Sequence, residues 1–206
     1  MNIYTTDKIR NVVLLGHGGA GKTSLVESMA YLSGITSRMG KVEDGNTVSD
    51  YGKEEQKRRI SISTSVVPIE WDGVKINVLD TPGYFDFIGE VEEAISAADA
   101  AVIVVSGKSG VEAGTEKAWE LCEKYKLPRM IYVTGMDADN ASFKNVVEKL
   151  TVCECCERDR KPLEGQGCRG MRNPRLQHGQ SEPVQRYFDG GGSRNKRGVY
   201  GPVFWR

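Results

Sequence analysis

The chain has 206 residues, enough for one domain of ordinary size. Its formal net charge is zero, so composition does not favour a nucleic acid or a membrane surface as a partner. Residues 1–10 lack the apolar core of a signal peptide, no run has the apolar length of a membrane span, and four of the five cysteines follow residue 150. We expect a cytoplasmic monomer that binds neither a membrane nor a specific DNA sequence.

A glycine-rich stretch near the N-terminus matches the pattern G-x-x-x-x-G-K-[ST] of a phosphate-binding loop. Its members are Gly16, His17, Gly18, Gly19, Ala20, Gly21, Lys22 and Thr23. The run 11–15 before it is short, apolar and β-branched, which is typical of a buried parallel strand. After it, Leu25, Met29 and Leu32 follow helical spacing and predict the apolar face of a helix. Strand, loop and helix together predict a site where the lysine reaches the β- and γ-phosphates and the threonine ligates Mg²⁺.

The next part of the chain reads as a loop followed by a hairpin. The polar stretch 37–59 has no steady apolar period, and we expect a mobile loop there. Strands are predicted at 65–71, with Pro68 near a sheet edge, and at 74–80. Asp72-Gly73 between them is a strong hairpin turn.

A second phosphate motif, Asp80-Thr81-Pro82-Gly83, begins where the second hairpin strand ends. An acidic residue at the carboxyl end of a buried strand can hold Mg²⁺, usually through water. The amide of Gly83 is suited to bond the γ-phosphate. By itself this motif is a weak signal of a phosphate site. Its distance along the sequence from the lysine of the first loop makes the signal strong.

Apolar strands alternate with helices through the rest of the body. We expect helices at 87–98, 115–125 and 143–150, and strands at 100–105 and 130–133. This alternation predicts an α/β fold with a mainly parallel, doubly wound sheet and helices on both faces. Apolar periodicity ends at about Thr151, so we predict a domain over 1–150 and a Gly-, Arg- and Cys-rich tail over 151–206. The tail's composition is typical of a disordered segment, or of translation in a shifted reading frame.

Most of residues 8–150 resembles the translational GTPases, and elongation factor G most closely. The resemblance is carried by Asp80-Thr81-Pro82-Gly83-Tyr84-Phe85-Asp86-Phe87, the first-switch stretch 55–62, Gly110-Val111-Glu112, the run 125–129 and Met136-Asp137. It implies a P-loop GTP-binding domain, incomplete on its C-terminal side, that hydrolyses GTP with Mg²⁺ during translocation on the ribosome. By the same resemblance Lys22 stabilises charge, Ser61 ligates Mg²⁺ where the family has threonine, and Gly83 transmits the loss of the γ-phosphate.

The chain departs from the family at three motifs. Tyr84 stands where the family has the histidine that positions the attacking water; a tyrosine hydroxyl can bond a water, but its ring is bulkier. The guanine-reading motif N-K-x-D appears as Thr134-Gly135-Met136-Asp137, which keeps the carboxylate that accepts from guanine. The S-A-[KL] loop is not found. Two alternatives stay open: a nucleotide-binding fragment without turnover, and a GTPase of the tetracycline-type ribosomal protection class.

Overall fold

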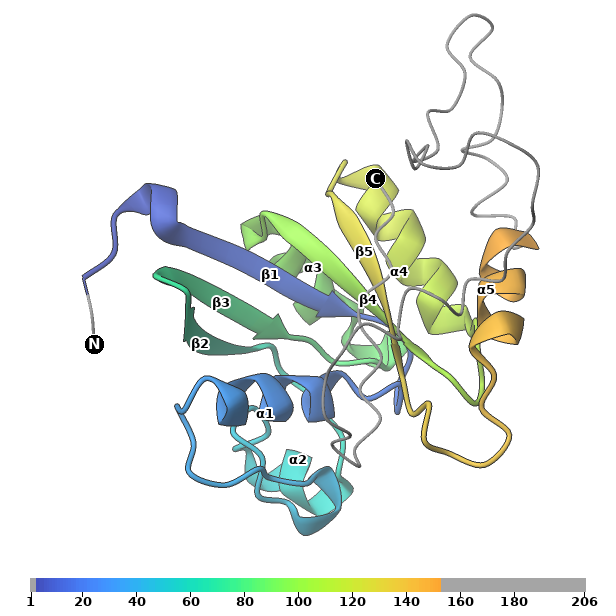
Figure 1. Ribbon diagram of the computed structural model, residues 1–206, viewed down its shortest axis with the longest axis horizontal. Coiled ribbons are helices and arrows are strands. Elements are labelled where there is room, and N and C mark those ends of the chain that lie inside the picture. The colour runs from blue at the N-terminus through green and yellow to red at the C-terminus, as the bar shows by residue number, and fades with distance from the viewer. Residues whose placement is uncertain (1–2, 153–206) are drawn as a thin grey trace, which may run out of the picture.

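A five-stranded sheet runs through residues 3–152, the part of the chain that the computed structural model describes (Figure 1). Its strands are β1 (Ile9–Leu15), β2 (Ser65–Trp71), β3 (Val74–Asp80), β4 (Ala100–Ser106) and β5 (Arg129–Thr134). Their order across the sheet is β2-β3-β1-β4-β5, and β2 alone of these five runs antiparallel to its neighbour. The prediction of a mainly parallel sheet is therefore confirmed.

The hairpin forms where the turn chemistry places it. Asp72 and Gly73 have φ angles of 49° and 74°, the positive values that a tight two-residue hairpin turn requires. Pro68 lies within β2, which is an edge strand of the sheet. An edge tolerates proline because one side of the strand has no partner that needs the missing amide.

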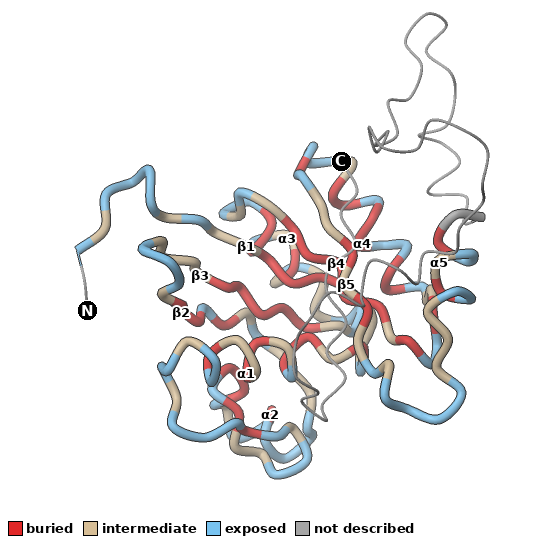
Figure 2. The backbone as a smooth tube through the Cα atoms, viewed as in Figure 1, coloured by how far each residue is buried: buried red, intermediate tan, exposed pale blue. Residues whose placement is uncertain are grey.

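Helices cover both faces of the sheet, as a doubly wound fold requires (Figure 1). They are α1 (Lys22–Leu32), α2 (Lys53–Arg58), α3 (Ile88–Ala97), α4 (Ala113–Lys124) and α5 (Phe143–Val152), with short 3-10 turns at Thr6–Lys8, Val42–Asp44 and Phe85–Phe87. One apolar cluster joins the sheet to α3, α4 and α5, and a second joins it to α1. Buried residues accordingly follow the central strands in Figure 2.

The apolar face predicted for helix α1 is only part of the face that it buries, since Leu25 and Met29 pack partly buried against the core. Leu32 is 72% exposed, whereas Val26 and Ala30 are fully buried against the sheet. Thr23 and Glu27 lie on the same face and are also buried. The pattern was wrong for Leu32 alone, and it could not detect Thr23 and Glu27, two polar side chains on the inner face whose partners come from distant parts of the chain.

The predicted loop 37–59 contains a 3-10 turn and the helix α2, so the prediction of a loop throughout this stretch was wrong. We call residues 37–63 the switch segment. The buried residues of this segment are Gly40, Thr47, Ser49, Asp50 and Glu55. Since none of them has an apolar side chain, hydrophobic periodicity has nothing to detect.

The other helix boundaries differ from the predicted ones by a few residues. Helix α3 begins at Ile88 after the turn at Phe85–Phe87, and α4 begins at Ala113. Helix α5 continues to Val152, past the predicted domain boundary. The predictions for the tail fall on residues 153–206 and lie outside the described residues. Within the described part, no helix has the length and hydropathy needed to cross a bilayer.

Candidate nucleotide site

The carboxyl ends of four parallel strands meet at one edge of the sheet and place the predicted motifs side by side. The phosphate-binding loop follows β1, Asp80 ends β3, and Thr134 ends β5. Strand β1 lies between β3 and β4, where the chain's strand order reverses direction. Ligands of open α/β sheets bind at such a switch point. The fold thus brings together the residues that the sequence assigned to nucleotide binding.

The phosphate-binding loop bends tightly over the neighbouring strand. Gly16 has a φ of 136°, and a Cβ there would lie 2.3 Å from the carbonyl oxygen of Val104. Gly21, the N-cap of α1, has a φ of 91°. Both positions therefore require glycine, for backbone conformation and in one case for space as well. The loop ends at the N-terminus of α1, where free amides favour an anion.

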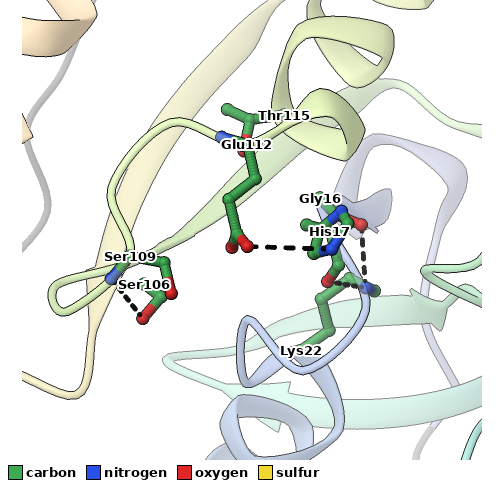
Figure 3. A network of polar contacts seen from close by, with 7 residues as sticks. All are labelled: Gly16, His17, Lys22, Ser106, Ser109, Glu112 and Thr115. Atoms are coloured by element: carbon green, nitrogen blue, oxygen red, sulfur yellow. Dashed lines mark hydrogen bonds and ion pairs between the residues drawn. The ribbon is translucent and has the colours of Figure 1, made fainter.

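Lys22 is buried inside this loop and contacts the backbone of the loop itself. Its Nζ donates to the carbonyl oxygens of Gly16 and His17 at 2.9 and 3.0 Å (Figure 3). Burial lowers the pKa of Lys22 to about 8, against the opposing attraction of the Asp80 carboxylate. A buried ammonium group has lost its hydration, so the oxygens of a nearby phosphate would stabilise it strongly.

Gly83 and Tyr84 lie directly against the loop. A Cβ at Gly83 would lie 2.5 Å from Nζ of Lys22 and 2.6 Å from the amide nitrogen of Gly18. The ring of Tyr84 packs near Gly18, where an added Cβ would be 3.1 Å from ring carbons. The side chain of Tyr84 stays 46% exposed. The second phosphate motif therefore touches the first at the lysine.

A group of oxygen atoms around Thr23 fits a magnesium ion. The Thr23 hydroxyl donates to Oδ2 of Asp80 at 2.9 Å and lies 3.2 Å from Oγ of Ser61. Among the described residues, Oδ1 of Asp80 is one of the few buried side-chain atoms without a hydrogen-bond partner. Mg²⁺ prefers such hard oxygen ligands and keeps several waters. The residues predicted to bind metal are therefore adjacent, although they lie in three separate motifs.

Burial dominates the electrostatics of this group. It raises the pKa of Asp80 to about 6, while the nearby hydroxyls of Ser49 and Thr23 and the Lys22 ammonium act in the opposite direction. Asp50 was missed by the sequence reasoning: it is 4% exposed, and burial raises its pKa although the Ser61 hydroxyl lowers it. No local pattern separates Asp50 from the exposed acids of the same segment, because its burial depends on contacts far along the chain.

Thr134, the first residue of the predicted guanine-reading motif, has its hydroxyl bonded to the protein backbone. Its hydroxyl donates to the carbonyl oxygen of Ala20 at 2.6 Å and approaches that of Val105 at 3.3 Å. It thereby links the loop after β5 to the phosphate-binding loop. Asp137, the predicted guanine acceptor, lies three residues further on and is exposed.

The side chain of His17 points toward the N-terminus of helix α4. Its Nε2 is 3.7 Å from a carboxylate oxygen of Glu112, the N-cap of that helix (Figure 3). A Cβ at Gly114 would lie 2.6 Å from the Cα of His17. His17 therefore serves the loop through its backbone, while its side chain packs the loop against α4.

Comparisons with known proteins agree with this geometry. The model of the elongation factor Tu GTP binding domain family matches residues 7–174. Mitochondrial ribosome-releasing factor 2 of Drosophila grimshawi is 44% identical over 148 residues, and that of Drosophila melanogaster is 45% identical over 145 residues. These matches cover 72% and 70% of the chain, but the chain spans only about a fifth (20%) of the length of either relative.

Two solved structures are similar to the described fold. A protein from Thermus thermophilus superposes with a TM-score of 0.68 at 43% identity, covering 70% of this chain and 22% of that protein. A bacterial selenocysteine-specific elongation factor superposes with a TM-score of 0.60 at 21% identity, covering 75% of this chain and 24% of that one, and supports the fold alone. With the phosphate-binding loop, the second phosphate motif and the parallel sheet in place, the chain belongs to the elongation factor Tu GTP binding domain family.

Proposed function

We propose that this chain binds GTP with Mg²⁺ and, in association with a ribosome, hydrolyses the bond to its γ-phosphate. The observation that carries the proposal is the convergence of the Lys22 ammonium, the Thr23 and Ser61 hydroxyls and the Asp80 carboxylate beside Gly83. Burying an ammonium and a carboxylate with so few partners costs free energy, and a turn that binds no ligand would gain nothing in return.

Each of these groups has a distinct part to play toward the nucleotide. Lys22, released from the carbonyls of its own loop, stabilises negative charge on the β- and γ-phosphates. Thr23 and Ser61 hold Mg²⁺ through their hydroxyls, and Asp80 orients its waters. When bound, the metal ion neutralises charge that develops on the phosphate oxygens. The close approach of Gly83 to Lys22 supports a role for its amide in responding to the γ-phosphate.

A second candidate function, binding without turnover, is favoured by Tyr84. The ring of Tyr84 packs against Gly18 of the phosphate-binding loop, and a phenol is a poor proton acceptor at neutral pH. In the binder, Tyr84 covers the loop and does not orient water. In the enzyme, its hydroxyl takes the place of the imidazole expected from the family.

Release of phosphate in a single turnover separates the two functions. The parent, Tyr84→His and Tyr84→Phe are loaded with GTP and followed with and without ribosomes. A water-orienting group contributes on the order of 10²–10⁴-fold. The enzyme reading requires the parent to turn over and Tyr84→Phe to lose that rate. If parent and Tyr84→Phe are equally inactive and Tyr84→His gains activity, the chain is a binder.

The ribosome as partner follows from the family and from the names of the relatives, which are ribosome-releasing factors. Within this proposal, movement of the ribosome along its message, its release and its protection from an inhibitor are three possible roles. The relatives are mitochondrial by name, so a cytoplasmic location stays a prediction from sequence. Sedimentation of the chain with ribosomes in the presence of a non-hydrolysable GTP analogue tests the partner.

A further inference from the structure

The side chain of Glu27 reaches from helix α1 into the switch segment. Glu27 is 1% exposed, and its Oε2 accepts a hydrogen bond from the amide of Gly40 at 2.8 Å. Its Oε1 accepts another from the amide of Val48. The carboxyl group of one buried side chain therefore binds both ends of the stretch 40–48.

The stretch closes tightly on this carboxylate. A Cβ at Gly40 would lie 2.7 Å from Oε2 of Glu27 and 2.7 Å from the carbonyl oxygen of Asn46. The amide of Lys41 donates to the side chain of Asn46 at 2.8 Å, which closes the turn between them. The position of Gly40 thus has room for hydrogen alone.

Glu27 lies one helical turn after Thr23, so both side chains project from the same face of α1. The residues that follow Val48 lead to the metal group: the carbonyl of Ser49 accepts from the Ser65 hydroxyl at 2.6 Å, and Asp50 faces Ser61. The helix that supplies one metal ligand therefore also fixes the segment that supplies the other.

A second carboxylate holds the far side of the segment. Glu55 in α2 accepts from the amides of Gly52, Ile62 and Ser63 at 2.9, 3.0 and 3.1 Å. Ser61 lies between these contacts. Its hydroxyl is thus positioned from one side by α2 and from the other through the stretch that Glu27 binds.

We propose that Glu27 is a positioning residue for magnesium: by binding the amides of Gly40 and Val48 it holds the switch segment, and with it Ser61, over Thr23. This inference rests on the proposed binding of a nucleotide with Mg²⁺. It assigns to Glu27 no contact with the nucleotide or the metal.

Two substitutions disturb the contact from opposite sides. Glu27→Gln replaces one acceptor oxygen with a donor that faces an amide. Gly40→Ala leaves the helix untouched and pushes the stretch off the carboxylate, which keeps the test valid if the first variant folds poorly. Glu116→Gln and Gly89→Ala are the matched controls, since Glu116 is exposed and a Cβ at Gly89 meets no atom within 4 Å.

Two readouts are needed. The first is trypsin cleavage after the exposed residues Lys57, Arg58 and Arg59 in the nucleotide-free protein. The second is release of a fluorescent GDP across a series of Mg²⁺ concentrations, with EDTA as the end point. Disruption of the bonding between Glu27 and the stretch 40–48 predicts cleavage at least about tenfold faster and about tenfold more Mg²⁺ for half-maximal retention in both variants. Release in EDTA should match the parent.

Faster cleavage with an unchanged Mg²⁺ requirement would make Glu27 a brace without influence on the metal, and would overturn the proposal. Cleavage and Mg²⁺ requirement both equal to the parent would overturn it as well. If the parent retains no fluorescent GDP at any Mg²⁺ concentration, the proposed function itself fails and this inference falls with it. Normal retention by the parent with unaffected variants removes the inference alone.

Discussion

Asp80→Asn should make the nucleotide-free protein more stable while weakening its use of magnesium. Burial raises the pKa of Asp80 from 3.8 to about 6. A carboxyl group with a folded-state pKa above its unfolded value makes its full contribution to stability only below the unfolded pKa, and the chain loses that contribution as the pH rises through the folded pKa. The parent therefore loses stability between about pH 4 and pH 6, and the asparagine variant does not.

The size of the effect follows from the same two pKa values. Their difference corresponds to about 3 kcal/mol in the free energy of unfolding above pH 7, and to about 1 kcal/mol at pH 4.5. Asparagine keeps an acceptor for the Thr23 hydroxyl, which donates to Asp80 at 2.9 Å. The variant thus resembles the protonated aspartic acid, and its advantage should grow with pH.

Urea unfolding in EDTA at pH 4.5 and pH 8 measures this advantage. Asp44→Asn, at an exposed position, is the control and should track the parent at both values. Adding GDP with Mg²⁺ should stabilise the parent well above its EDTA value and help Asp80→Asn much less, because the metal loses a charged partner. An advantage that is independent of pH, or a variant less stable than the parent at pH 8, would refute the reasoning.

Three further substitutions test the nucleotide site and the core. Lys22→Ala should abolish detectable GDP binding in equilibrium dialysis, since it removes the one ammonium buried in the loop; binding as tight as the parent's would disprove the loop assignment. Asp137→Asn should reduce the preference for GTP over XTP in competition with a fluorescent nucleotide, and an unchanged ranking would mean that Asp137 does not read the base. Ile103→Ala, at a fully buried position of β4, should lower the free energy of unfolding by about 3–4 kcal/mol in urea, whereas a loss below about 1 kcal/mol would show that the core closes over the gap.

The sequence was most informative where one residue type determines a local geometry. The strands 65–71 and 74–80 have the predicted bounds because Asp72 and Gly73 adopt the positive φ angles of a tight turn. Gly16, the first glycine of the predicted phosphate-binding loop, approaches Val104 so closely that no side chain would fit there.

Prediction failed where burial is polar and its partners are remote. Asp50 and Glu27 look like solvated acids in the printed sequence, yet one is 4% and the other 1% exposed. Helix α2 was missed for the same reason, because Glu55 is buried by amides several residues away. Hydrophobic periodicity reports apolar faces alone, and these residues have none.

The polar interior of the switch segment has a thermal consequence. When a core strand such as β4 is exposed, apolar surface meets water, heat capacity rises and urea favours the opened state. Release of residues 37–63 uncovers mainly carboxylates, hydroxyls and amides, because the fully buried side chains of this segment are polar and Val42, Ile60 and Ile62 are only half-buried. Polar hydration lowers the heat capacity, so the mostly polar surface uncovered by this release gives a small heat-capacity change for its area. Heating therefore shifts the switch segment along a nearly straight free-energy line, while the sheet beneath it follows the curved stability profile of an ordinary globular core.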